Sequence, residues 1–289
     1  EPIEAEGYTY DRIAGSSAGA IVASLVAAGY TSKELKEIFM ELDYNRFADV
    51  SMLSKFGVVG KTFSLLLSKG IYDGKFIRQF VYDLLEKKGV RTFGDLKLAT
   101  ADESGTIHDD YKLVVLSADI TSGAVVRFPW DYEKYGLNPD TQLVADAVRT
   151  SASLPFYYKP VQLGGHYLVD GGVISNLPIW IFEEDIQDEK MRNPAIGVKL
   201  SARPEAMMHA MGRNTSNTFT YGFSILKTIT EAADQIHLSE QSTLERTLFV
   251  DTAQVASTDF NLTREDQLLL YNSGKEAAKK FFSKANPTN

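Results

Sequence analysis

The sequence predicts an α/β fold, a three-layer α/β/α domain with a mostly parallel central sheet covered by helices. Short runs rich in β-branched residues alternate along the chain with segments whose apolar residues recur at helical spacing. A β-like run in residues 8–14 also leads through a tight turn directly into a helix of small residues. Because no repeat, low-complexity tract or linker divides the chain, we expect a single domain over residues 1–289.

Three segments have the apolar spacing of amphipathic helices. The first, Ser32–Leu42, follows a capping box in which Thr31 and Glu34 exchange side-chain and backbone hydrogen bonds. Lys75–Lys88 repeats the same apolar spacing, and Arg264–Lys284 closes the chain. We expect all three helices to cover a hydrophobic core with their apolar sides.

Five short runs have the composition of β-strands. They are Lys112–Leu116, Val125–Phe128, Tyr167–Val169, Ala195–Leu200 and Thr247–Val250. Helical segments separate several of these runs, and strands joined by helices favour parallel pairing. The sequence therefore predicts a mostly parallel sheet with helices on its faces.

The composition excludes several classes of function. The 30 lysines and arginines against 38 aspartates and glutamates give a formal net charge of −8, which argues against a surface devoted to nucleic acid. The absence of cysteine excludes disulfides, a thiol nucleophile and cysteine-ligated zinc. The histidines show no metal-ligand spacing and are His108, His166, His209 and His237. We therefore do not expect metal-dependent hydrolysis.

No segment predicts a transmembrane helix. The longest apolar stretch, Ala18–Ala28, is well short of the roughly 20 residues that span a bilayer. We expect a protein that is cytoplasmic or peripheral to a membrane. The segment Ser51–Gly70 mixes large apolar residues with three lysines, a pattern compatible with shallow insertion at a lipid interface. A buried helix pair with solvated lysines explains the same pattern, and we favour that interpretation.

The turn at residues 15–19 has the pattern GxSxG, which is typical of a nucleophile elbow. Such an elbow holds a strained serine, here Ser17, with its hydroxyl free at a strand-to-helix turn. Gly15 and Gly19 would let neighbouring backbone pass without a Cβ clash, and the Ala18 amide at the helix N-terminus could donate to an oxyanion. The pattern is short enough to arise by chance, but the strand before it and the helix up to Gly29 favour the elbow.

Asp170 is the strongest candidate for the base that would accept the proton of Ser17. It ends the run Tyr167–Val169 and precedes Gly171 and Gly172, and an open α/β sheet presents its chemistry at carboxyl ends of strands. A simple Asp-Gly turn is the alternative interpretation.

Three other residues could take part in the chemistry. His209 and His237 come late in the chain, as a Ser-Asp-His triad of the hydrolase order requires, but neither stands at the end of a predicted strand. Asp119 also ends a strand, and there we favour a turn-capping role.

The GSSAG motif with its following helix, and DGG in YLVDGGVISNLP, resemble the patatin-like lipid acyl hydrolases. Further landmarks in the family's order extend the resemblance over about residues 10–180, and they are Gly70–Gly74, Thr92–Leu96, Ser117–Gly123, Val148–Pro155 and Asn176–Pro178. The resemblance implies that Ser17 is the nucleophile and Asp170 the base of a Ser/Asp dyad without histidine, with Gly171 and Gly172 supporting the site.

One part of the family pattern has no counterpart in residues 1–11. Patatin-like proteins open with a strand and a glycine-rich loop whose amides form most of the oxyanion hole, and this segment contains no such loop. We therefore expect a strand and a glycine-rich turn upstream of Glu1, so that the domain is N-terminally incomplete as printed.

The resemblance implies a serine lipid acyl hydrolase of the phospholipase A type, which forms an acyl-enzyme and cleaves glycerolipid esters, with phospholipids preferred. This mechanism calls for neither a metal nor an organic cofactor. Its partner would be a lipid substrate at a membrane or micelle interface; the family pattern sets neither head group nor oligomeric state. The alternatives are a non-catalytic lipid-binding or signalling module on the same fold, an α/β-hydrolase esterase with a Ser-Asp-His triad, and an acyltransferase. The α/β-hydrolase fold normally places several strands before its elbow, whereas one short run precedes Ser17 here, which argues against that alternative. Acyltransferases usually pair the serine with a histidine.

Overall fold

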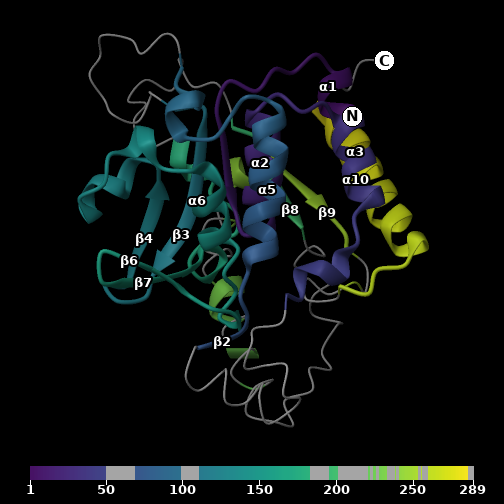
Figure 1. Cartoon of the computed structure of the whole chain (residues 1–289). Helices are drawn as coiled ribbons and strands as arrows, with labels where there is room; N and C mark the ends of the chain where they lie inside the picture. Colours follow the sequence, from purple (N-terminus) through teal and green to yellow (C-terminus); the bar gives the residue numbers. More distant parts are fainter. Residues whose placement is uncertain are drawn as a thin grey trace.

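The computed structural model describes residues 1–49, 69–98, 111–182, 195–200, 221, 224–225, 228–232, 238, 241–252, 255 and 260–285 (Figure 1). Its central sheet has five strands, β1 (Ile13–Ser16), β3 (Leu113–Asp119), β4 (Ala124–Phe128), β6 (Val161–Leu163) and β7 (His166–Asp170). Every residue of β3 is buried, which explains why this run is almost continuously apolar.

Strand β3 is the centre of this sheet because three strands pair with it. β4 lies antiparallel along one edge, with Val115 opposite Phe128 and Asp119 opposite Ala124. The other edge is divided: β1 runs parallel to the first half, and β7 runs antiparallel to the second half. β6 extends the sheet beyond β7 with antiparallel pairing. β1 and β7 therefore approach each other end to end along a single edge of β3.

Two further strand pairs are parallel. β2 (Gly70–Tyr72) pairs with β5 (Phe156–Tyr158), and β8 (Gly197–Leu200) pairs with β9 (Thr247–Val250). Together with β1 and β3 they supply the predicted parallel pairing, while β4, β6 and β7 add an antiparallel part. The predicted α/β fold with a sheet covered by helices is confirmed.

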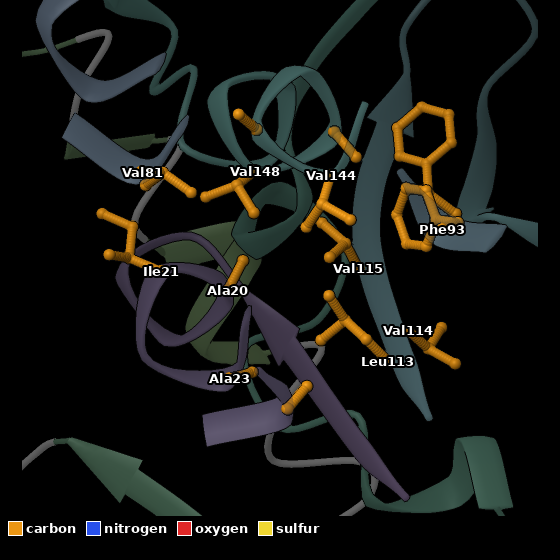
Figure 2. Packing of buried hydrophobic residues seen from close by; sticks show 14 of the residues in the cluster. Ala20, Ile21, Ala23, Val81, Phe93, Leu113, Val114, Val115, Val144 and Val148 are labelled. Atoms are coloured by element: carbon orange, nitrogen blue, oxygen red, sulfur yellow. The ribbon is translucent and has the colours of Figure 1, made fainter. Parts of the chain in front are cut away.

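Three helices pack together next to β1 and β3: α2 (Ala18–Ala27), α5 (Lys75–Lys87) and α6 (Val144–Ser151). Figure 2 shows Ala20 of α2 and Val148 of α6 on the same side of Val115 of β3, which is fully buried. The small side chains along α2 allow its backbone to lie close to the sheet. This packing holds the first turn of α2 against the end of β1.

The two ends of the described chain meet on another part of the molecule. α1 (Pro2–Ala5) and α3 (Ser32–Glu41) lie beside α10 (Arg264–Ala285), which also packs on β9 (Figure 1). The Glu4 carboxylate accepts a hydrogen bond from the Ser32 amide at 2.9 Å, so it caps the first turn of α3.

Most predicted elements are confirmed within one to three residues at their ends. The capping box of Thr31 and Glu34 is present, and Gly29 adopts a positive φ of 89° just beyond α2, as a helix-ending glycine does. Elements that the sequence analysis missed are α1, α6, β2, β5, β6, the short helix α9 (Gln241–Glu245) and 3₁₀ turns at Tyr44–Phe47, Phe93–Leu96, Trp130–Tyr135, Pro139–Thr141, Gly171–Val173 and Ile179–Phe182.

Within the described ranges, no helix combines the length and the apolar content that crossing a bilayer requires. The segment Ser51–Gly70, considered above for a lipid interface, lies outside the described residues apart from Lys69 and Gly70.

Candidate active site

Ser17 forms a one-residue turn between β1 and α2. Its φ of 54° and ψ of −129° lie in a region that side-chain-bearing residues seldom occupy. Such a conformation costs about 1–3 kcal/mol and persists only where surrounding contacts hold it. The geometry is the strained strand-to-helix turn that the GxSxG pattern predicts.

The two glycines of the pattern have different surroundings. A Cβ at Gly15 would lie 2.5 Å from the Gly19 carbonyl oxygen and 2.7 Å from the Ala20 Cα, so only glycine fits there. A Cβ at Gly19 would meet nothing within 4 Å, because Gly19 lies on the exposed first turn of α2. The predicted close approach of neighbouring backbone is therefore confirmed at Gly15 and is wrong at Gly19.

Asp170 lies directly against the Ser17 hydroxyl. The Ser17 Oγ donates a hydrogen bond to the Asp170 Oδ2 at 2.6 Å, and the Gly172 amide donates to the Asp170 Oδ1 at 2.7 Å. Asp170 is buried, with only 2% of its surface exposed. Burial disfavours the charged form and raises the pKa of this carboxyl to about 6, although both hydrogen bonds act in the opposite direction.

The end-to-end arrangement of β1 and β7 explains how residues far apart in the chain meet here. Ser16, the last residue of β1, lies opposite Leu116, and Asp170, the last residue of β7, lies opposite Ser117. Because Leu116 and Ser117 are consecutive in β3, the residues at the two strand ends become neighbours. Asp170 thus ends a strand as predicted, but that strand runs antiparallel to β3.

A side chain does not fit at Gly171, and one at Gly172 would displace neighbouring side chains. A Cβ at Gly171 would overlap the Leu116 carbonyl and lie 2.7 Å from the Ser16 Oγ, and a Cβ at Gly172 would overlap the Asn176 side chain. The backbone after Asp170 can therefore turn closely over β3, and the Gly172 amide reaches the Asp170 carboxylate. Both glycines support the geometry of the carboxylate.

Two serines that the sequence analysis did not single out also contact this site. The Ser17 amide donates to the Ser151 Oγ at 3.0 Å, and the Asp170 amide donates to the Ser153 carbonyl at 3.0 Å. Both serines belong to the landmark Val148–Pro155, so the sequence marked the segment without revealing which atoms it touches.

Ala18 begins α2 and is exposed beside Ser17. The first amides of a helix have no acceptor within the helix, and the helix dipole places partial positive charge there. The position can stabilise negative charge that develops next to the Ser17 hydroxyl.

Asp119 has the turn-capping role that the sequence favours. Its carboxylate accepts from the Thr121 amide at 2.8 Å and the Ser122 hydroxyl at 2.7 Å, and it lies 2.7 Å from the His166 Nδ1. Burial alone would raise the pKa of Asp119, but these hydrogen bonds outweigh burial and lower it to about 2. His166 stands at the opposite end of β7 from Asp170, while His108, His209 and His237 lie outside the described residues.

Comparison with known proteins is consistent with this geometry. A family model described as patatin-like phospholipase matches residues 3–183. The uncharacterized protein YqhO of Bacillus subtilis (strain 168) is 34% identical over 285 residues, covering 97% of this chain and 91% of that protein. The uncharacterized protein R571 of Acanthamoeba polyphaga mimivirus is 23% identical over 270 residues, covering 92% and 81%.

Among solved structures, VipD from Legionella pneumophila aligns with a TM-score of 0.53 at 17% identity. The alignment covers 98% of this chain, which spans 63% of the VipD chain. At this identity the likeness shows a shared fold.

The glycine pair yields a matched prediction on stability. Gly15→Ala places a methyl group against the backbone of α2, where it clashes, and should lower the free energy of unfolding by at least about 1–3 kcal/mol. Gly19→Ala adds a methyl group in open space on a helix and should leave stability unchanged or raise it by about 0.5–1 kcal/mol. Urea unfolding of the two variants measures the difference; equal effects would show that the elbow is not closely packed at Gly15.

Proposed function

Because this chain belongs to the patatin-like phospholipase family, a family of lipid hydrolases, we propose that it cleaves ester bonds of glycerolipids with Ser17 and Asp170 as its catalytic dyad. The observation that carries the proposal is the 2.6 Å hydrogen bond from the Ser17 Oγ to the Asp170 Oδ2 at a strained elbow. This bond joins the nucleophile to its base: the Ser17 oxygen has a free lone pair for attack, and the buried Asp170 carboxylate can accept the Ser17 proton. Nucleophilic catalysis by serine requires both.

The first half-reaction transfers the acyl group to the enzyme. Asp170 accepts the hydroxyl proton as the Ser17 Oγ attacks the ester carbonyl carbon, and the tetrahedral intermediate carries its negative charge on the former carbonyl oxygen. The Ala18 amide at the N-terminus of α2 supplies one donor to that oxyanion. The intermediate collapses when the ester C–O bond breaks, and the departing alcohol takes the proton from Asp170.

The second half-reaction restores the enzyme. Asp170 accepts a proton from a water molecule as the water oxygen attacks the acyl-Ser17 carbonyl. The bond between the acyl carbon and the Ser17 Oγ then breaks, the proton returns from Asp170 to Ser17, and the fatty acid leaves. Water is the only co-reactant in this cycle.

Burial adapts Asp170 to this role. A carboxylate with the ordinary pKa of 3.8 is a weak base, whereas burial raises the pKa of Asp170 to about 6, closer to neutral pH. General-base catalysis is most efficient when the base is mostly unprotonated but still binds a proton well. We propose that the substrates are phospholipids rather than neutral lipids, a preference that rests on the family resemblance.

The dyad predicts the effect of two substitutions. Ser17→Ala removes the nucleophile, and Asp170→Asn replaces the base by an amide that can accept from Gly172 and donate to Ser17 but cannot take a proton. Each should reduce hydrolysis of a fluorescent phospholipid by roughly 10⁴-fold or more. His209→Ala and His237→Ala should stay within a few-fold of wild type; inactivity of either folded histidine variant would favour a triad.

Stability measurements separate loss of chemistry from loss of fold. Because the folded-state pKa of Asp170 lies above 3.8, its contribution to stability is fully present below about pH 4 and is lost as pH rises through about 6. Asp170→Asn stays neutral, so above pH 6 it should unfold at a higher temperature than wild type. A pKa raised from 3.8 to about 6 corresponds to on the order of 3 kcal/mol.

The same pKa predicts the pH dependence of the reaction. Asp170 must be unprotonated to act as a base, so kcat/KM should fall tenfold per pH unit on the acid side, with a midpoint near 6. A pH–rate profile on a soluble ester at constant ionic strength measures the midpoint. A midpoint near 4 would show that the reacting carboxyl is not the buried one.

The cycle is predicted to need no metal ion. Hydrolysis should continue in excess chelator, and a fluorophosphonate should stop it by modifying Ser17, since the dyad supplies both nucleophile and base. Peptide mass spectrometry locates the modified residue. Inhibition by chelator that a divalent cation reverses, or modification of another serine, would contradict the proposed cycle.

A further inference from the structure

We propose that the C-terminal end of α6 and the two residues that follow it position the dyad, with the Ser151 hydroxyl holding the nucleophile and the Ser153 carbonyl holding the base. One residue, Ala152, separates the two serines, and each serine contacts the backbone of one member of the pair. This inference rests on the proposed function, because it assigns a role relative to that reaction.

Ser151 fixes the conformation of Ser17. The Ser17 amide points at the Ser151 Oγ across 3.0 Å, and this bond ties the turn to a different helix. Ser151 is fully buried, so water cannot readily replace its hydroxyl as acceptor. Relaxation of Ser17 from its φ of 54° toward an ordinary negative φ would turn its amide away from Ser151. The bond therefore opposes release of the backbone strain.

The same contact affects the oxyanion site. Because the Ser17 amide already donates to Ser151, it is engaged and does not serve as an oxyanion donor. Stabilisation of the developing charge from this side of the elbow falls to the first turn of α2, which starts at Ala18. The Ser17 amide therefore holds the elbow through Ser151, and the Ala18 amide is the one that faces the substrate.

Ser153 holds the other half of the dyad. Its carbonyl accepts the Asp170 amide at 3.0 Å, at the point where β7 ends and the chain turns into Gly171. A register shift or fraying of β7 at its last residue would break this bond and move the carboxylate. The distance between the Ser17 Oγ and the Asp170 Oδ2 is therefore set through one short segment.

Arg149 braces this segment against the neighbouring strand pair. Its Nη1 donates to the Ser153 Oγ at 2.8 Å, and its Nη2 donates to the carbonyls of Asp73 and Lys159 at 2.6 and 2.9 Å. Asp73 follows β2 and Lys159 follows β5, so the guanidinium joins α6 to that pair of strands. Burial lowers the pKa of Arg149 and nearby carboxylates, Asp49 first, oppose the shift, so it remains a cation.

The test compares Ser151→Ala with Ser24→Ala, which removes an equally buried serine hydroxyl that donates to the Ile21 carbonyl within α2. Ser151→Ala should lower kcat on a soluble ester by about 10- to 100-fold with KM within threefold, because misplacing a reacting group by about 1 Å costs on the order of 10²-fold. The rate at which a fluorophosphonate modifies Ser17 should fall in parallel, and Ser24→Ala should match wild type.

Two further readouts distinguish positioning from a general loss of structure. The acid-side midpoint of the pH–rate profile should not fall below about 6 in Ser151→Ala, because the burial of Asp170 and its hydrogen bond from the Gly172 amide are kept and a weaker hydrogen bond from Ser17 can only raise the pKa. Ser151→Cys, which keeps a side chain of similar shape with a weak acceptor, should give a kcat between those of wild type and Ser151→Ala. Rates are normalised to the folded fraction from circular dichroism, so partial unfolding does not imitate the effect.

Wild-type kcat in Ser151→Ala, or a loss no larger than in Ser24→Ala, would overturn the inference while leaving the dyad intact. Full activity of Ser17→Ala would instead overturn the proposed function on which the inference rests. The two failures are therefore distinguishable in one set of variants.

Discussion

The shared edge of β3 is the constraint on which the candidate site depends. β1 occupies the first half of that edge and β7 the second, and the two strands run toward each other until Ser16 and Asp170 face consecutive residues of β3. Backbone pairing therefore brings the chain at residue 17 next to the chain at residue 170, and residues 151–153 then hold the two side chains in place. The 2.6 Å bond between the two side chains depends on this sheet register, because a slip by one residue would turn the end of a strand to the other face.

Burial of Asp170 has two opposing effects. It raises the pKa of the carboxyl to about 6 and so makes a stronger base, but it also makes the charged form costly to hold in the folded protein. The strained backbone of Ser17 is a second local cost. Both are tolerated because β3, α2 and α6 form a continuous core next to them, including Leu116, which is only 1% exposed. Stability and reactivity are thus linked at the same few residues.

Local sequence signals predicted most of the structure. The capping box at Thr31, the five strand runs and the GxSxG turn all depend on neighbours within a few residues, and all are present. The three-residue strands β2 and β5 were missed because such short runs carry little periodicity. The contact of Ser151 with Ser17 could not be predicted, because it joins residues 134 positions apart through packing of α6 on the sheet. The predicted close approach at Gly19 was wrong, because the GxSxG pattern does not show which of its glycines contacts neighbouring backbone.

Titration of the Asp170 carboxyl by ¹³C NMR is the most direct test of the Ser17–Asp170 dyad. The Asp170 resonance is assigned as the one that disappears in Asp170→Asn, and its chemical shift is followed from pH 3 to pH 9 in the folded protein. We predict a midpoint near 6 that moves upward in Ser17→Ala, because the Ser17 hydrogen bond favours the charged carboxylate. A midpoint near 3.8 that does not respond to Ser17→Ala would show that Asp170 is neither buried against nor bonded to the serine, and would contradict the dyad.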